Sequence, residues 1–119
     1  MSVTFAHIVF DASDVEALAR FWSGVLERPV DEGANGFFAT IGMADRGTSP
    51  TPTLMFLMVP DPTPGKNRVH IDLSTDDLPA EVDRLVALGA THHSDHDEYG
   101  TTWCTLADPE GNLFDVAAA

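Results

Sequence analysis

The 119-residue sequence predicts an α+β protein made of paired βαβββ modules, which form a curved mixed sheet, a cup with the helices on its outside. Two observations lead to this class. The phrase AHIVFDASD around His7 returns 63 residues later as VHIDLSTDD around His70, so that Asp14 falls on Asp77. Each phrase alternates apolar and polar residues, as a half-buried strand does, and a helix-like pattern follows each one.

The first module begins with this strand and continues into a helix. Ser13 or Asp14 can cap the segment 14–27, in which apolar residues recur at i, i+3, i+4 and i+7. Strand-like sequence follows at 36–42 and 53–59, separated by a loop rich in Gly, Ser, Thr and Pro. The module therefore covers about residues 4–59.

The second module repeats this order after the Pro-rich connector 60–67 and covers about residues 68–118. Asp76 or Asp77 precedes the helical segment, and Gly89 is suited to end it. Further strands are expected at 90–94, 101–107 and 112–118, and DPEGN at 108–112 has the composition of a tight turn. At this length both modules belong to a single domain, 1–119.

The charge limits the classes of partner. Nineteen acids against six bases give a formal net charge of −13, which repels nucleic acid and anionic lipid surfaces. The longest apolar run is far too short to span a bilayer, and the N-terminus lacks the basic region of a signal peptide. The single Cys104 cannot form an intramolecular disulfide, which fits a reducing compartment. We expect a cytoplasmic protein with a small-molecule ligand.

The two repeated histidines share a phase in their strands. Because successive side chains of a strand alternate between faces, His7 and His70 both point away from the apolar face of their own strand. Both are therefore expected to face into the cup.

Three segments give the chain a resemblance to the vicinal-oxygen-chelate superfamily, which contains glyoxalases, extradiol dioxygenases and bleomycin-resistance-type binding proteins. They are HIVFDASDVEALARFWSGVLERPV, HIDLSTDDLPAEVDRLVALGA and LADPEGNLFDV, in the order and spacing of that superfamily. The resemblance implies that His7, His70 and Asp115 bind one divalent ion, Fe, Mn, Ni or Zn, and that the chain forms a homodimer. The fourth ligand of glyoxalase-type members would fall on Leu57, which cannot coordinate. Superfamily members usually have Glu where this sequence has Asp115.

Two imidazoles and one carboxylate leave about three positions of an octahedral ion open. Such an ion can act as a Lewis acid on a small oxygenated substrate, in an isomerase, lyase or dioxygenase reaction. Leu57 argues against glyoxalase I activity itself. The alternative class is a metal-free binding or resistance protein that sequesters an aromatic metabolite or antibiotic in the cup. The residues that would carry out catalysis are not identified by the sequence.

Other residues are candidates for supporting roles. Asp72 lies on the His70 face and either orients a ligand imidazole or is an ordinary solvated carboxylate. Arg68 either meets a substrate oxygen or pairs with one of the many acids. A substrate pocket is expected from Phe38, Phe56, Leu57, Arg68 and Trp103, although apolar residues on strands are also typical of a core.

His92, His93 and His96 form a cluster in a polar, acidic segment that resembles an exposed hairpin. Adjacent strand residues point to opposite faces, so His92 and His93 are not expected to act together, and the cluster is not expected to be the native metal site. Cys104 is expected to be a small buried apolar side chain and not a nucleophile.

Overall fold

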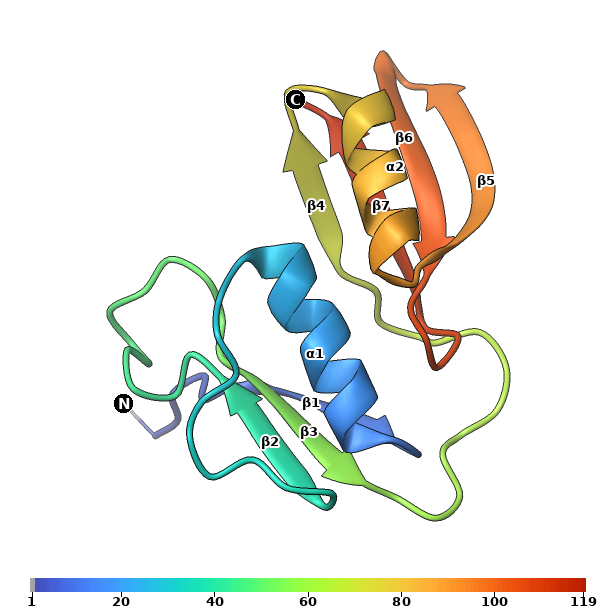
Figure 1. The fold of residues 1–119 in the computed structure, drawn as a ribbon. Coiled ribbons are helices and arrows are strands. Elements are labelled where there is room, and N and C mark those ends of the chain that lie inside the picture. Colours follow the sequence, from blue (N-terminus) through green and yellow to red (C-terminus); the bar gives the residue numbers. More distant parts are fainter. Residues whose placement is uncertain (1) are drawn as a thin grey trace. The chain divides into compact units, whose positions relative to one another are not determined.

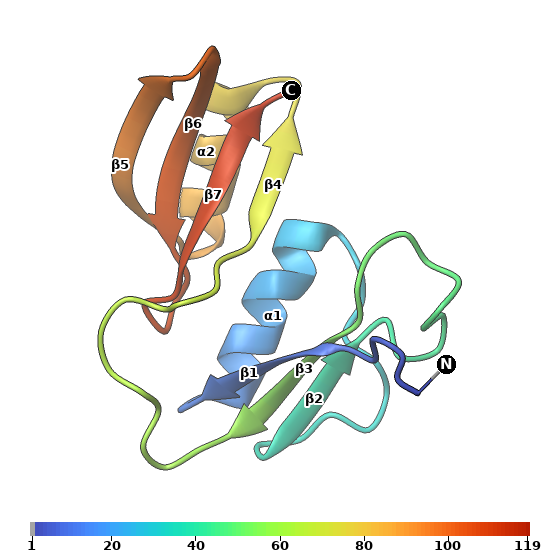
Figure 2. The ribbon, with the colours of Figure 1, turned by 180° about the vertical axis from the view of Figure 1, so that it is seen from behind.

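A computed structural model describes residues 2–119, which divide into two compact units. Unit 1 ends at Pro62, and unit 2 comprises Thr63–Ala119. Each unit consists of one sheet with one helix across one of its faces (Figure 1). Figure 2 shows the other face of each sheet, which the helix of that unit leaves uncovered. The α+β class expected from the sequence is confirmed, with two small curved mixed sheets, one in each unit.

Unit 1 contains three strands and one helix among its described residues. These are β1 (Ile8–Ala12), α1 (Val15–Leu26), β2 (Phe38–Ile41) and β3 (Leu54–Met58). The sheet order is β1-β3-β2, with β1 parallel to β3 and β2 antiparallel to it. Val30, between α1 and β2, forms an isolated antiparallel bridge with Ile41.

The helix of unit 1 is fixed by its cap and by an aromatic core. Asp14 is the N-cap, and its side chain accepts a hydrogen bond of 3.1 Å from the amide of Ala17. The indole of Trp22 is buried against the ring of Phe10, which in turn stacks on Phe56 at 5.3 Å between ring centroids. The apolar stripe of α1 therefore packs on the face of the sheet that carries Phe10 and Phe56.

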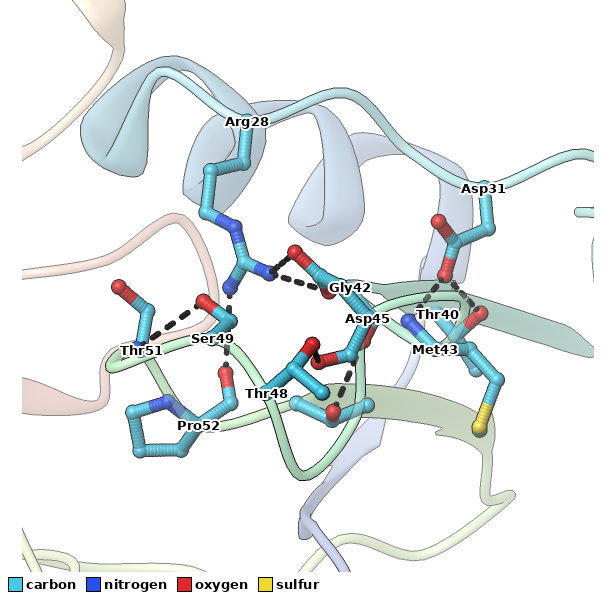
Figure 3. A network of polar contacts seen from close by, with 11 residues as sticks. Arg28, Asp31, Thr40, Gly42, Met43, Asp45, Thr48, Ser49, Thr51 and Pro52 are labelled. Atoms are coloured by element: carbon cyan, nitrogen blue, oxygen red, sulfur yellow. Dashed lines mark hydrogen bonds and ion pairs between the residues drawn. The ribbon is translucent and has the colours of Figure 1, made fainter.

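The loop between β2 and β3 is tied to the end of α1 by Arg28 (Figure 3). The guanidinium of Arg28 donates to the Asp45 carboxylate at 3.0 Å and to the carbonyl of Pro52 at 3.3 Å. Gly42 has φ +83°, and a Cβ at this position would collide with the Arg28 guanidinium. The positive φ favours glycine at position 42, and a larger residue there would also displace the tip of the Arg28 side chain.

Unit 2 has the same order of elements with one additional strand. It contains β4 (Asp72–Thr75), α2 (Leu78–Leu88), β5 (Thr91–Glu98), β6 (Thr101–Ala107) and β7 (Leu113–Ala118). The sheet order is β4-β7-β6-β5; β4 is parallel to β7, and the other neighbours are antiparallel. Asp77 caps α2 by accepting from the amide of Ala80 at 3.2 Å, as Asp14 does for α1.

The hairpin that joins β5 to β6 is longer than the sequence indicated. β5 continues to Glu98, and the turn is made by Tyr99 and Gly100, both with positive φ. The helices of the two units have 12 and 11 residues, and within residues 2–119 no helix is long and apolar enough to cross a bilayer.

Candidate metal centre

Three side chains with metal-ligating atoms meet at the start of β4 and the middle of β7. The Nε2 atom of His70 lies 3.2 Å from Oδ1 of Asp72 and 3.5 Å from Oδ2 of Asp115. Asp72 and Asp115 are register partners on adjacent parallel strands, so their side chains emerge on the same face. The three residues offer one ligand atom each, and these atoms lie within 4.8 Å of one another.

The carboxylate of Asp115 is held in its orientation by its neighbours. The Thr105 hydroxyl on β6 donates a 2.6 Å hydrogen bond to Oδ1 of Asp115, and Oδ2 is the atom closer to His70. The backbone amide of Asp115 donates to the carbonyl of Ile71 at 3.0 Å, which fixes β7 against the segment that carries His70. The Asp115 side chain is 23% exposed and that of His70 is 43% exposed, so the group is open to a ligand.

The donor set suits a divalent first-row cation. One imidazole nitrogen and two carboxylate oxygens are typical ligands of Mn²⁺ and Fe²⁺, which accept nitrogen and oxygen donors with positions left open. The sequence assigned Asp72 a supporting role beside His70. Its Oδ1 lies within hydrogen-bond distance of His70 Nε2, the nitrogen that also faces Asp115, so Asp72 is placed to contribute an oxygen of its own to an ion bound there.

His7 lies in unit 1, immediately before β1 begins at Ile8. Its Nδ1 atom is buried and has no hydrogen-bond partner anywhere in residues 2–119. Buried polar atoms are nearly always hydrogen-bonded, so an unsatisfied imidazole nitrogen is an unusual feature that a bound cation would resolve.

The residues expected to line a pocket differ in their environment. In unit 1 Phe56 is fully buried in the core, whereas Phe38 and Leu57 project from the sheet face opposite α1 and are exposed or half-buried. In unit 2 Arg68 is exposed and precedes β4. Trp103 lies on the same sheet face as Asp115, and its ring stacks on His96 at 4.8 Å between centroids.

Strand register changes one expectation about unit 1. In the 63-residue repeat, Val9 of unit 1 is equivalent to Asp72 of unit 2. Val9 pairs with Met55 on β3, and Asp72 pairs with Asp115 on β7. The counterpart of Asp115 is therefore Met55; the sequence alignment, which set Phe56 on Phe114, put Leu57 there. Leu57 lies two residues further along the same face. A carboxylate is absent at either position.

Sequence reasoning missed a second group of potential ligands on β5 and β6. His92 Nε2 lies 3.0 Å from Asp95 Oδ1, and the Sγ atom of Cys104 completes a set of three ligand atoms within 4.8 Å of one another. The hydrogen bond with His92 holds the pKa of Asp95 below its usual value. Burial, with the nearby Asp95 carboxylate, raises the pKa of the Cys104 thiol to about 11.

This second group depends on a β-bulge, which sequence alternation does not reveal. Cys104 is buried, as expected, but it lies opposite Asp95 in the register and has an acidic neighbour that was not anticipated. The spacing of His92 and Asp95, three residues apart, indicates opposite faces in a regular strand.

The geometry can now be compared with known proteins. The model of the glyoxalase-like domain matches residues 7–117, nearly the whole chain, and the match begins at His7. The chain belongs to the glyoxalase-like domain family. A comparison with curated proteins gives no match.

Solved structures of glyoxalase-like proteins have the same fold. A glyoxalase/bleomycin resistance protein/dioxygenase family enzyme from Burkholderia phytofirmans PsJN superposes with a TM-score of 0.77 at 17% identity, covering 95% of this chain and 96% of that one. A mutant of a fosfomycin resistance protein FosX from Listeria monocytogenes, in complex with Mn(II) and 1S,2S-dihydroxypropylphosphonic acid, gives a TM-score of 0.76 at 13% identity, covering 98% of this chain and 90% of that one. Lactoylglutathione lyase from Agrobacterium tumefaciens gives 0.66 at 15% identity, covering 100% and 96%. At these identities the likeness concerns the fold alone.

Proposed function

We propose that this glyoxalase-like protein is an enzyme that holds one divalent metal ion on His70 and Asp115, with His7 as a further ligand. The observation that carries the proposal is the convergence of His70 Nε2 and Asp115 Oδ2, 3.5 Å apart, on an open sheet face. The Mn(II) complex of the FosX neighbour supports it by showing that a protein of this fold binds such an ion. Mn²⁺ or Fe²⁺ fits this set of nitrogen and oxygen ligands, and Ni²⁺ and Zn²⁺ are alternatives.

The proposed ion supplies Lewis-acid chemistry for an isomerase, lyase or dioxygenase reaction on a small oxygenated substrate. The residues of the chain prepare the site for this ion. Thr105 keeps the Asp115 carboxylate turned toward His70. Asp72 places Oδ1 3.2 Å from the same Nε2 atom, where it could contribute a further oxygen to the ion. His7 is included because its buried Nδ1 has no other partner in the described chain and because the family pattern begins with it.

A binding protein without a metal is the second candidate, and the open face of unit 1 favours it. Four of the strand positions that face away from α1 are apolar, with Val9 44% and Phe38 37% exposed and with Met55 and Leu57 between them, and Asp11 and Thr40 share this face. Such a surface suits a flat apolar metabolite or antibiotic. In this alternative His70 and Asp115 of unit 2 hold no metal ion.

We further propose that the protein is a cytoplasmic homodimer. The free, buried Cys104 is compatible with a reducing compartment, and the exposed apolar residues of unit 1 offer a surface for association. Light scattering coupled to size exclusion tests the oligomeric state directly. A monomer at micromolar concentration would contradict the dimer.

Manganese binding tests the metal site. We expect untagged, chelator-treated protein to take up Mn²⁺ stoichiometrically, measured by the loss of the free-ion EPR signal, and we expect His70→Ala and Asp115→Ala to abolish uptake. Thr105→Val should weaken it by about 10–100-fold, because the variant loses only the group that orients Asp115. His93→Ala is the matched control, because His93 is exposed and lies outside both groups of ligand atoms.

The outcomes of this titration separate the two candidates. Uptake that is lost in the His70 and Asp115 variants and kept in the control supports the enzyme, and screening of oxygenated substrates then follows. A folded wild-type protein that takes up no Mn²⁺, Fe²⁺, Ni²⁺ or Zn²⁺ at this site rules out the enzyme proposal and leaves the binding protein. Unchanged uptake in His7→Ala would remove His7 from the ligand set without affecting the other two.

A further inference from the structure

We propose that His92, Asp95 and Cys104 form a second metal site, selective for Zn²⁺ or a similar late first-row cation. This site is independent of the one proposed on His70 and Asp115. It lies on the other face of the β4-β7-β6-β5 sheet, because Cys104 and Thr105 are consecutive on β6 and Thr105 is the residue that contacts Asp115.

A β-bulge brings the three side chains together. His92 pairs with Leu106 and Ser94 pairs with Thr105. Leu106 and Thr105 are consecutive on β6, whereas His93 lies between His92 and Ser94 on β5, so His93 is the extra residue of the bulge. In a regular strand without the bulge, His92 and Asp95 are three residues apart and would point to opposite faces. With it, His92 lies opposite Leu106 and Asp95 opposite Cys104, both on the buried face of β6.

The distances fit a small tetrahedral cation. Bond lengths of Zn²⁺ to nitrogen and oxygen imply that two such ligand atoms lie roughly 3.3 Å apart in a tetrahedral site. His92 Nε2 and Asp95 Oδ1 are 3.0 Å apart, and all three donor atoms fall within 4.8 Å of one another. An ion bound here needs only small side-chain movements, and a water molecule can occupy its fourth position.

The ligand types differ from those of the first site and point to a different ion. One thiolate, one imidazole and one carboxylate form a mixed set that Zn²⁺ and Co²⁺ accept, whereas Mn²⁺ prefers oxygen-rich sites. Binding replaces the thiol proton of Cys104, which is released to solvent, and forms a metal–sulfur bond. Because His92 and Asp95 are exposed, the ion can enter from solvent while the sulfur bonds to it from the buried side.

The expected consequence is a fixed edge of the sheet. β5 is the terminal strand of the order β4-β7-β6-β5, with no strand on its outer side in unit 2. Two ligands on β5 and one on β6 would join this edge strand to its neighbour across the bulge, where the ladder is interrupted. The ion would therefore protect β5 from opening.

A cobalt titration of the untagged, chelator-treated protein tests the proposal. Co²⁺ bound to a thiolate gives a sulfur-to-metal charge-transfer band in the near ultraviolet, and we expect this band to saturate at one equivalent per chain and to disappear when Zn²⁺ is added. The His92→Val and Asp95→Asn variants should raise the Kd for Co²⁺ by more than about tenfold. Cys104→Ala should remove the band entirely. Circular dichroism of each variant establishes that it is folded.

Two controls separate this site from the first. His93→Ala removes an adjacent, exposed imidazole and should leave the band unchanged. His70→Ala should abolish Mn²⁺ uptake and likewise leave the cobalt band unchanged. Absence of the band in folded wild-type protein overturns the proposal. So does a band that persists with unchanged affinity in both His92→Val and Asp95→Asn, because it would then arise from the thiol alone.

Discussion

The two units are copies of one arrangement that carry different chemistry at equivalent positions. Strand register aligns β1, β3 and β2 with β4, β7 and β6. In this alignment, Val9 corresponds to Asp72, Met55 to Asp115, Ala39 to Cys104 and Val30 to His92. At these four positions unit 1 is apolar where unit 2 has a potential metal ligand, whereas the repeated pair His7 and His70 places an imidazole in both units.

Other positions are shared and indicate what the fold itself requires. Asp14 and Asp77 cap the two helices in the same manner, through the amide three residues later. Thr40 corresponds to Thr105, facing Met55 in one unit and Asp115 in the other. The caps and this threonine position are therefore common to both units, whereas the potential ligand positions of unit 2 differ from unit 1 on both faces of the sheet.

The largest effect is expected from the core of each unit. Phe56 and Phe114 are the fully buried aromatic residues of the two middle strands, so Phe56→Ala and Phe114→Ala should each lower the free energy of unfolding by about 3–5 kcal/mol. Amide hydrogen exchange of the intact protein, read out on peptide fragments from each unit, then compares the opening of the two units. We expect Phe56→Ala to accelerate exchange chiefly in β1–β3 and Phe114→Ala chiefly in β4–β7, because the two units are separately compact.

Should the alanine variants not fold, Phe→Leu at the same positions gives a milder test, with a loss of about 1 kcal/mol. Equal acceleration in both units by either variant would contradict the comparison, because it would mean that the chain opens as one cooperative body.

The features that the sequence predicted correctly have local signals. The 63-residue repeat, both helices and the Gly89 stop are encoded by spacing and by capping chemistry within a few residues. The family itself follows from three long segments, and the family model confirms it. These signals do not depend on which strand pairs with which.

The features that the sequence did not reveal depend on pairing between strands. The alignment that gave Leu57, in place of Met55, as the counterpart of Asp115 matched two phenylalanines, but hydrogen bonding of β3 to β1 sets the register. The bulge at His93 is likewise defined only by the pairing of β5 with β6, whereas simple alternation would place His92 and Asp95 on opposite faces. The group of His92, Asp95 and Cys104 was therefore not recognisable from one strand.

An intermediate effect on stability is expected from the thiol of Cys104, which occupies the position in unit 2 that is equivalent to Ala39 in unit 1. The pKa of Cys104 is raised from 9.0 to about 11 in the folded protein, so the folded state disfavours the thiolate. Its contribution to stability is fully present below pH 9 and is lost as the pH rises through about 11. In chelator-treated protein, we expect wild type to lose about 2 kcal/mol of unfolding free energy relative to Cys104→Ala over this range.

Denaturant unfolding measures this difference when it is carried out at several pH values from 8 upward, spaced roughly one pH unit apart. Parallel profiles of wild type and Cys104→Ala would show that the thiol titrates normally and that its burial has no energetic consequence. The exposed Asp95 is a poor source of such a profile, because its pKa is lowered and it is ionised throughout this range.

The smallest effect tests the shared part of the comparison. Asp14→Ala and Asp77→Ala should each lower the free energy of unfolding by about 1 kcal/mol, because each removes the acceptor for one helix N-terminal amide. The corresponding Asp→Asn variants keep a side-chain oxygen that can accept the hydrogen bond. They should lower the free energy of unfolding by only about 0.3–0.5 kcal/mol, chiefly because the interaction of the charge with the helix dipole is lost. Chemical denaturation of the four variants under one condition provides the measurement. If removal of one cap has no effect while removal of the other has the full effect, the two caps are equivalent in sequence but not in energetics, and the helix N-terminus is then not a shared constraint of the two units.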